Sequence, residues 1–162
     1  MTGIGSGVPA DDRRKRGFAM LRIRDVLNTK GNQIWSIGPD ATVYEALELM
    51  AEKNVGALVV LDGERLAGIF SERDYARKMI LKGKHSRDTL VKELMTSEVY
   101  SVTPGETVEE CMAVMTAAHC RHMPVFEDKK LVGVVSIGDI VSAAITEHKV
   151  KIRDLEKYIT GF

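Results

Sequence analysis

The sequence predicts an α+β (α/β-like) fold: two β-α-β-β-α repeats packed about a pseudo-twofold axis, with a cleft between them. The main observation is a pattern of glycine, two apolar residues, serine, two variable residues and aspartate, found at residues 68–74 and 133–139. The offset between copies is constant, since Ser136 minus Ser71 and Pro104 minus Pro39 both give 65. A constant offset indicates that a whole supersecondary unit is duplicated.

This offset divides the chain into four parts. We expect a flexible N-terminal arm at residues 1–21, a first repeat at 22–84, a second at 85–148 and a C-terminal helical extension at 149–162. The length of 162 residues and hydrophobic content of 44% suit one globular core. Because a unit of about 60 residues buries too little surface alone, the repeats are expected to pack on each other.

Each repeat is expected to open with a short strand, at residues 34–37 and 99–102, followed by a proline turn. A helix then begins at a capping box, Thr42 with Glu45 and Thr107 with Glu110. Apolar residues spaced by three and four predict one buried face on each helix. They are Val43, Ala46, Leu47 and Met50 in the first copy, and Val108, Cys111, Met112 and Met115 in the second.

A β-hairpin follows in each repeat. Residues 55–61 and 66–70 are joined by Asp62-Gly63, which favours a type I′ turn. Residues 123–126 and 131–135 are joined by Asp128-Lys129, a weaker turn signal. A second helix is expected directly after the motif serine.

The last helix is expected to continue beyond the second repeat. Apolar positions and one histidine recur at spacings of three and four: Val141, Ile145, His148, Ile152, Leu155 and Ile159. Such a stripe would face water in a monomer, which predicts a homodimer sealed by the tail helix.

Composition excludes several functional classes. The 23 basic and 23 acidic residues balance, so no overall field favours nucleic acid or membranes. The longest apolar run, 55–61, is far shorter than the roughly 20 residues of a membrane-spanning helix. No secretory signal is recognised and only two cysteines occur, which favours the cytoplasm. Because no catalytic motif is present, we expect a protein that is not an enzyme.

The duplicated Ser/Asp motif has two interpretations. Ser71 and Asp74 suit a helix N-terminus as capping residues. The same groups could also bind a ligand, because free N–H groups bind an anion and a carboxylate matches the vicinal hydroxyls of a ribose. The glycine before each motif, Gly68 or Gly133, is expected to let a ligand approach the backbone. Together these features point to a nucleotide-like anion with a diol.

Residues from about 24 to 148 resemble a tandem of cystathionine-β-synthase-type (CBS) domains, the adenine-nucleotide-sensing module of regulatory proteins. The resemblance implies that Asp74 and Asp139 bind ribose and that the ligand contains adenine. The segment Arg121-His122-Met123-Pro124-Val125 is similar to an element of the γ subunit of AMP-activated protein kinase. There, a basic pair reaches across the repeat interface to the phosphate, although the order of the two basic residues is reversed here.

Two unequal pockets are therefore expected. The first contains the larger set: Ser71, Arg73, Asp74, Arg121, His122 and Pro124, with Lys30 in reach of the same nucleotide and Ser36, Ala57 and Leu58 beside the adenine. The second contains Ser101, Ser136 and Asp139 without comparable charge. We expect the first pocket to hold phosphate better, because a guanidinium can grip a phosphate with two hydrogen bonds.

The sequence thus predicts a regulatory sensor of AMP or a related adenine nucleotide (ADP or ATP), which signals occupancy to an unknown regulated protein, with no metal expected. The leading alternative ligands are NAD(H) and S-adenosylmethionine. A small metal enzyme built on Cys111, His119, Cys120 and His122 is a further alternative, although their spacing is not that of zinc modules. A DNA-binding regulator would use the basic residues 13–16, which are more typical of a solvated arm.

Overall fold

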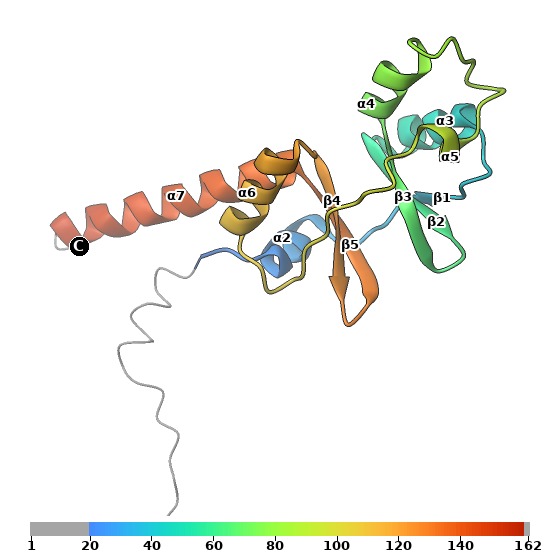
Figure 1. Ribbon diagram of the computed structural model, residues 1–162. Coiled ribbons are helices and arrows are strands. Elements are labelled where there is room, and N and C mark those ends of the chain that lie inside the picture. Colours follow the sequence, from blue (N-terminus) through green and yellow to red (C-terminus); the bar gives the residue numbers. More distant parts are fainter. Residues whose placement is uncertain (1–19, 161–162) are drawn as a thin grey trace, which may run out of the picture.

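The computed structural model describes residues 20–160 and contains two small α+β units side by side, with one long helix extending from the second (Figure 1). The predicted fold class is confirmed. The N-terminal arm expected at residues 1–21, with its basic run at 13–16, lies almost wholly outside the described residues.

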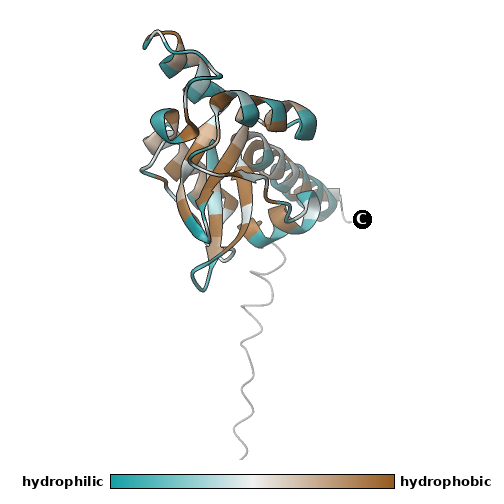
Figure 2. Ribbon diagram, turned by 90° about the vertical axis from the view of Figure 1, so that its right-hand side faces the viewer, coloured by the Kyte–Doolittle hydropathy of each residue, from teal (hydrophilic) through white to brown (hydrophobic). Residues whose placement is uncertain are grey.

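Each unit is built on a small sheet. In the first, β1 (Ser36–Ile37) pairs parallel with β2 (Ala57–Asp62), which pairs antiparallel with β3 (Arg65–Ser71). In the second, β4 (His122–Glu127) pairs antiparallel with β5 (Lys130–Ser136). The strand predicted at 99–102 is reduced to a single bridge between Val102 and Val125, because only Val102 exchanges backbone hydrogen bonds with β4. Apolar residues concentrate on these strands (Figure 2).

The two predicted capping boxes are confirmed. Helix α3 (Val43–Lys53) begins where Thr42 Oγ1 accepts from the Glu45 amide at 3.1 Å and Glu45 Oε2 accepts from the Thr42 amide at 2.8 Å. Helix α6 (Val108–Ala118) begins with the same exchange between Thr107 and Glu110. The buried face of each helix carries the predicted apolar residues, although Leu47 and Met112 are only partly buried.

The helix after the first motif is shorter and less regular than expected. It consists of α4 (Glu72–Asp74), followed at once by the π-helical turn η1 (Tyr75–Met79). Its counterpart in the second unit is the continuous helix α7 (Ile137–Thr160), which confirms the prediction that this helix outlasts the repeat. Within residues 20–160, no helix combines the length and hydropathy needed to cross a membrane.

The two cores exchange helices across the sequence repeats. Helix α2 (Ile23–Lys30) lies at the start of the first sequence repeat, yet its Ile23, Val26 and Leu27 are buried in the core of the second unit. Helix α5 (Val91–Leu94) lies near the start of the second sequence repeat, yet Val91 and Leu94 are buried in the core of the first unit. The sequence boundaries at 22–84 and 85–148 therefore do not separate the two cores, and the units are interlocked.

Both motif glycines face protein, which corrects the expectation that they make room for a ligand. A Cβ on Gly68 would lie 2.6 Å from the backbone oxygen of Thr96. A Cβ on Gly133 would lie 2.7 Å from Cδ2 of Leu27. Each glycine is required by the close approach of a segment from outside its hairpin.

The hairpin turns also differ from expectation. In the first hairpin Asp62 pairs with Arg65, so Gly63 and Glu64 form the turn, and only Gly63 has a positive φ, of 65°. In the second hairpin both central residues, Asp128 and Lys129, have positive φ values, of 49° and 64°. The type I′ pattern, which needs positive φ at both positions, thus occurs in the second repeat and not in the first.

Replacing Lys129 with glycine is expected to stabilise the protein by about 1 kcal/mol, because glycine adopts a left-handed conformation without the steric cost that a Cβ brings. Urea denaturation at neutral pH measures the change. Lys130→Gly is the matched control: this residue is in β5, where glycine weakens a strand, so this change should destabilise. Stabilisation by both changes, or by neither, would contradict the assignment of the turn.

Candidate functional site

Two adjoining pockets lie between the units. The first, which we call the Ser71 pocket, has a volume of about 440 Å³ and is lined by Ser71, Arg73 and Asp74 of the first unit and Tyr100, Arg121 and His122 of the second. The second, the Ser136 pocket, has about 280 Å³ and is lined by Lys30, Trp35, Ala57, Leu58, Ser136 and Asp139. Each pocket therefore combines the Ser/Asp turn of one repeat with the strand entrance of the other.

This arrangement corrects the predicted grouping. Lys30, Ala57 and Leu58 were expected beside Ser71, but they line the Ser136 pocket. The reason is the pseudo-twofold arrangement: the start of β2 faces the Ser/Asp turn of the other unit, just as the start of β4 faces Ser71.

Three predicted site residues, Ser36, Ser101 and Pro124, line neither of these pockets. Side chains alternate between the two sides of an extended segment. Accordingly Trp35 and Tyr100 reach the pockets while the serines that follow them are exposed. Pro124 is buried in β4, where its carbonyl accepts from the Val102 amide.

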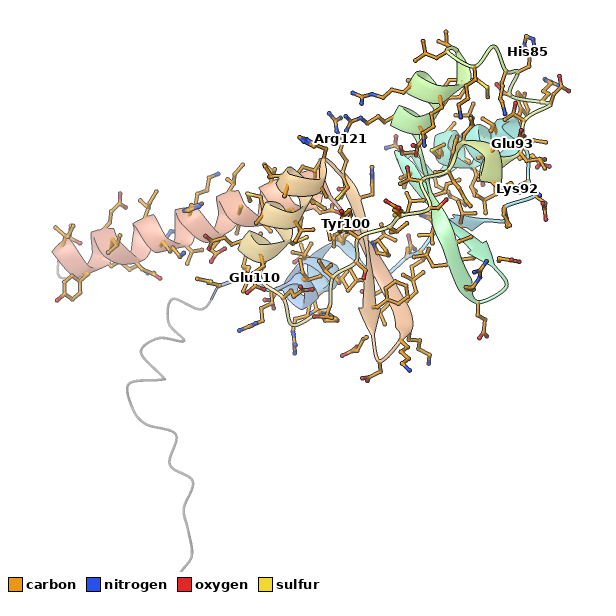
Figure 3. All side chains as sticks on the ribbon, in the orientation of Figure 1. His85, Lys92, Glu93, Tyr100, Glu110 and Arg121 are labelled. Carbon is orange, nitrogen blue, oxygen red and sulfur yellow. The ribbon has the colours of Figure 1, made fainter. Side chains whose placement is uncertain are left out.

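The sequence analysis missed this pair of aromatic residues. Tyr100 minus Trp35 gives 65, the repeat offset, so the signal was present in the duplication itself. Lys53 forms a cation–π contact with the Trp35 ring, with its Nζ 4.5 Å from the ring centroid. Each pocket thus has an aromatic wall at the equivalent position, and Tyr100 and Arg121 both lie in the region between the two units (Figure 3).

In the Ser71 pocket the carboxylate is fully engaged by protein. Asp74 is 9% exposed, and its Oδ2 accepts from the Ser71 amide at 3.0 Å and the Ser71 hydroxyl at 2.9 Å. Its Oδ1 accepts from Thr96 Oγ1 at 3.0 Å and is 3.0 Å from Lys78 Nζ. The capping role of this motif is thereby satisfied, and both carboxylate oxygens already have partners.

In the Ser136 pocket one carboxylate oxygen remains available. Asp139 Oδ2 accepts from the Ser136 amide at 2.8 Å and from Lys30 Nζ at 2.6 Å, whereas Oδ1 has no hydrogen-bond partner among residues 20–160. Burial opposes ionisation of Asp139, but the hydrogen bonds from Lys30 and Ser136 outweigh burial and lower its pKa. Lys30 therefore brings into this pocket one cation that the sequence analysis had expected in the other, and that cation is paired with Asp139.

The Ser71 pocket is richer in cations. Arg73, Arg77, Lys78 and Arg121 line it, against the acidic residues Glu72, Asp74 and Glu98. Arg73 donates to the His119 carbonyl at 3.3 Å and Lys78 pairs with Asp74, whereas Arg121 has no ion-pair partner in the described part of the chain. Arg77 likewise has no ion-pair partner among residues 20–160, so Arg121 and Arg77 are the two cations available to meet an anion, Arg121 from the second unit and Arg77 from the first.

His122 lines both pockets and forms part of the wall between them. Burial lowers its pKa below the ordinary value of 6.5, and the positive charge of Lys30 acts in the same direction, while Asp139 opposes them. His122 is therefore neutral at pH 7, and of the reversed basic pair Arg121 carries the charge.

Stability should fall on acidification below pH 6.5, since the unfolded chain then binds a proton that folded His122 resists. Melting temperatures at pH 7 and at pH 5 measure this effect. We expect the melting temperature of His122→Gln to fall less between these two pH values than that of the wild type. The exposed His85 supplies the control, because His85→Gln should retain the wild-type slope. Identical slopes for wild type and His122→Gln would contradict the argument.

The cysteine and histidine cluster considered for a metal enzyme does not assemble. Cys111 is buried in the second core, where burial, together with nearby Glu106 and Cys120, raises the pKa of its thiol to about 11. Within residues 20–160, no three histidine, cysteine or acidic side chains are close enough to hold a metal ion.

Comparison with known families decides the identity of the fold. The model of the CBS domain matches residues 23–81 and again residues 91–146. The chain belongs to the CBS domain family. As a CBS pair, it is 43% identical over 155 residues to the mitochondrial CBS domain-containing protein CBSX3 of Arabidopsis thaliana, covering 90% of this chain and 75% of that protein.

Solved CBS structures agree with this fold. A protein from Burkholderia ambifaria, described as involved in signal transduction, superimposes with a TM-score of 0.76 at 44% identity, covering 77% of this chain and 94% of that one. The CBS pair of MJ0100, with bound 5′-methylthioadenosine and S-adenosylmethionine, superimposes with a TM-score of 0.68 at 23% identity, covering 76% and 95%.

Proposed function

We propose that this CBS pair is a non-enzymatic cytoplasmic sensor that binds AMP or a related adenine nucleotide between its repeats and signals occupancy to a regulated protein. The observation that carries the proposal is the composition of the Ser136 pocket. It combines an aromatic ring, apolar side chains and a carboxylate with one free oxygen, which together suit the base and the ribose of a nucleoside.

In this proposal the adenine and the ribose of the ligand occupy the Ser136 pocket. Adenine lies against Trp35, Ala57 and Leu58, because a flat base gains from an aromatic face and apolar contacts. One ribose hydroxyl donates to Asp139 Oδ1. Lys30 has three N–H donors, of which two are used, by Asp139 and by the Val134 carbonyl at 2.8 Å. The third can donate to the other ribose hydroxyl, so Lys30 and Asp139 together recognise the diol.

In this proposal the phosphate lies in the Ser71 pocket, where the cationic side chains are concentrated. The two pockets share Gly56, Ile69 and His122, so a substituent that extends from the ribose past His122 enters the Ser71 pocket. There Arg121 is available to bind it.

A second candidate is a larger adenosyl ligand, NAD(H) or S-adenosylmethionine. It is favoured by the structural neighbour that holds S-adenosylmethionine and 5′-methylthioadenosine. S-adenosylmethionine, which has a sulfonium in place of phosphate, would depend on the Ser136 pocket without needing Arg121, whereas NAD(H) carries phosphates that Arg121 would bind.

A melting scan of the full chain with adenosine, AMP, ADP, ATP, NAD(H) and S-adenosylmethionine tests the proposal. Ligand at about 100 times its dissociation constant should stabilise the fold by about 2.7 kcal/mol. Guanosine monophosphate is the control for the base. Absence of any shift with the adenosyl compounds would refute the proposed function.

We propose in addition that the functional unit is a homodimer. Its basis is the apolar stripe of α7, which is exposed in the single chain. Sedimentation as a monomer at micromolar concentration would contradict this assembly.

A further inference from the structure

Helix α7 continues well past the CBS pair. The second family match ends at residue 146, whereas the helix ends at Thr160. Its C-terminal half extends away from both units (Figure 1). This half is therefore an addition to the family fold.

The exposed stripe of α7 has a regular heptad spacing. Steps of 4, 3, 4, 3 and 4 residues separate Val141, Ile145, His148, Ile152, Leu155 and Ile159. The apolar members are between 44% exposed, at Val141, and 81% exposed, at Ile159. A step of four leads from position d to position a, so isoleucine occupies every a position, at 145, 152 and 159. This 3.5-residue period is that of a coiled-coil seam. Isoleucine at a together with leucine at d favours two parallel strands, and the seam carries this combination at Ile152 and Leu155, with Val141 and His148 at the other d positions.

The charges beside the seam indicate the partner and its direction. In this register Lys151 is at g and Glu156 is at the following e position. In a parallel pair of identical helices, g faces the following e of the partner, so Lys151 meets Glu156 of the other copy, twice by symmetry. Lys151 Nζ is already 3.5 Å from Glu147 of its own helix, so the contact would extend an existing ion pair.

We propose that α7 pairs with α7 of a second copy of this chain as a parallel two-stranded coiled coil over residues 141–159. The inference rests on the proposed homodimer and specifies its interface. His148 is the single polar residue of the seam, and a polar core residue fixes register at some cost in stability.

Cysteine cross-linking of the full chain tests the direction of the helices. In a Cys120→Ser background, Ile152→Cys at position a should give a disulfide-linked dimer under mild oxidation, because a parallel coil brings residue 152 of both chains together. Val150→Cys is the matched control, since residue 150 is exposed but at the outward f position. Equal cross-linking of both variants would overturn the proposal.

Sedimentation separates the two ways in which the experiment can fail. A dimer in solution without cross-linking at residue 152 would refute the parallel coil and leave the homodimer standing. A monomer would refute both. Glu156→Lys should raise the dimer dissociation constant about fivefold, whereas Lys157→Glu at the outward f position should leave it unchanged. Equal effects of the two charge reversals would also overturn the register.

Discussion

Replacing Arg121 with methionine should lower the affinity for AMP and ADP by about 30- to 100-fold while leaving adenosine binding almost unchanged. Arg121 lines the Ser71 pocket without an ion-pair partner among residues 20–160, and His122 beside it is neutral at pH 7 because burial lowers its pKa. A charge-assisted hydrogen bond contributes about 1.5–3 kcal/mol, and a guanidinium can form two to one phosphate. Calorimetric titration of each ligand measures the loss.

Asp139→Asn is the matched variant for this prediction. The carboxylate is proposed to bind the ribose, which adenosine and its nucleotides share, so this variant should weaken all of them by a similar factor. If Arg121→Met weakened adenosine as strongly as AMP, the proposed position of the phosphate would be wrong. If Asp139→Asn weakened none of them, the ribose would bind elsewhere.

Gly68→Ala should destabilise the fold by about 3 kcal/mol, the largest effect on stability that we expect from a change of one methyl group. The new Cβ would lie 2.6 Å from the Thr96 oxygen and 3.0 Å from Met95 Sδ. Thr96 cannot withdraw easily, because its backbone exchanges two hydrogen bonds with Ile69 and its hydroxyl donates to Asp74. Urea denaturation gives the free energy of unfolding.

Gly133→Ala is the control at the equivalent position of the second repeat. Its Cβ would meet Cδ2 of Leu27 at 2.7 Å, and the end of a leucine side chain can rotate where a hydrogen-bonded backbone cannot. We expect a loss of about 1 kcal/mol. Equal losses at both glycines would show that the linker at Thr96 yields as easily as a side chain.

Features set by a few neighbouring residues could be predicted from the sequence. The capping boxes at Thr42 and Thr107 were correct because their hydrogen bonds join residues three apart. The continuation of α7 was correct because its periodicity is a property of one helix. The duplication itself predicted two Ser/Asp turns facing a cleft between the repeats.

Features set by contacts between distant segments could not be predicted in the same way. Nothing in residues 23–30 indicates that this helix belongs to the core of the second unit. Because α2 packs in the core of the second unit, Lys30 reaches Asp139, which is 109 residues away in the sequence. This contact adds a positive charge to the Ser136 pocket, where the sequence had indicated none. The role of Gly68 likewise depends on the path of the linker at Thr96 and not on its own motif.

Titration of the full chain with AMP, followed by tryptophan fluorescence, tests the central claim most directly. Trp35 is the single tryptophan of the chain and lines the Ser136 pocket, so its emission reports on that pocket alone. We expect a saturable change with AMP that is strongly weakened by Asp139→Asn, and no comparable change with guanosine monophosphate. An unchanged emission throughout the titration, with AMP and with the other adenosyl compounds, would contradict the claim that this pocket binds them.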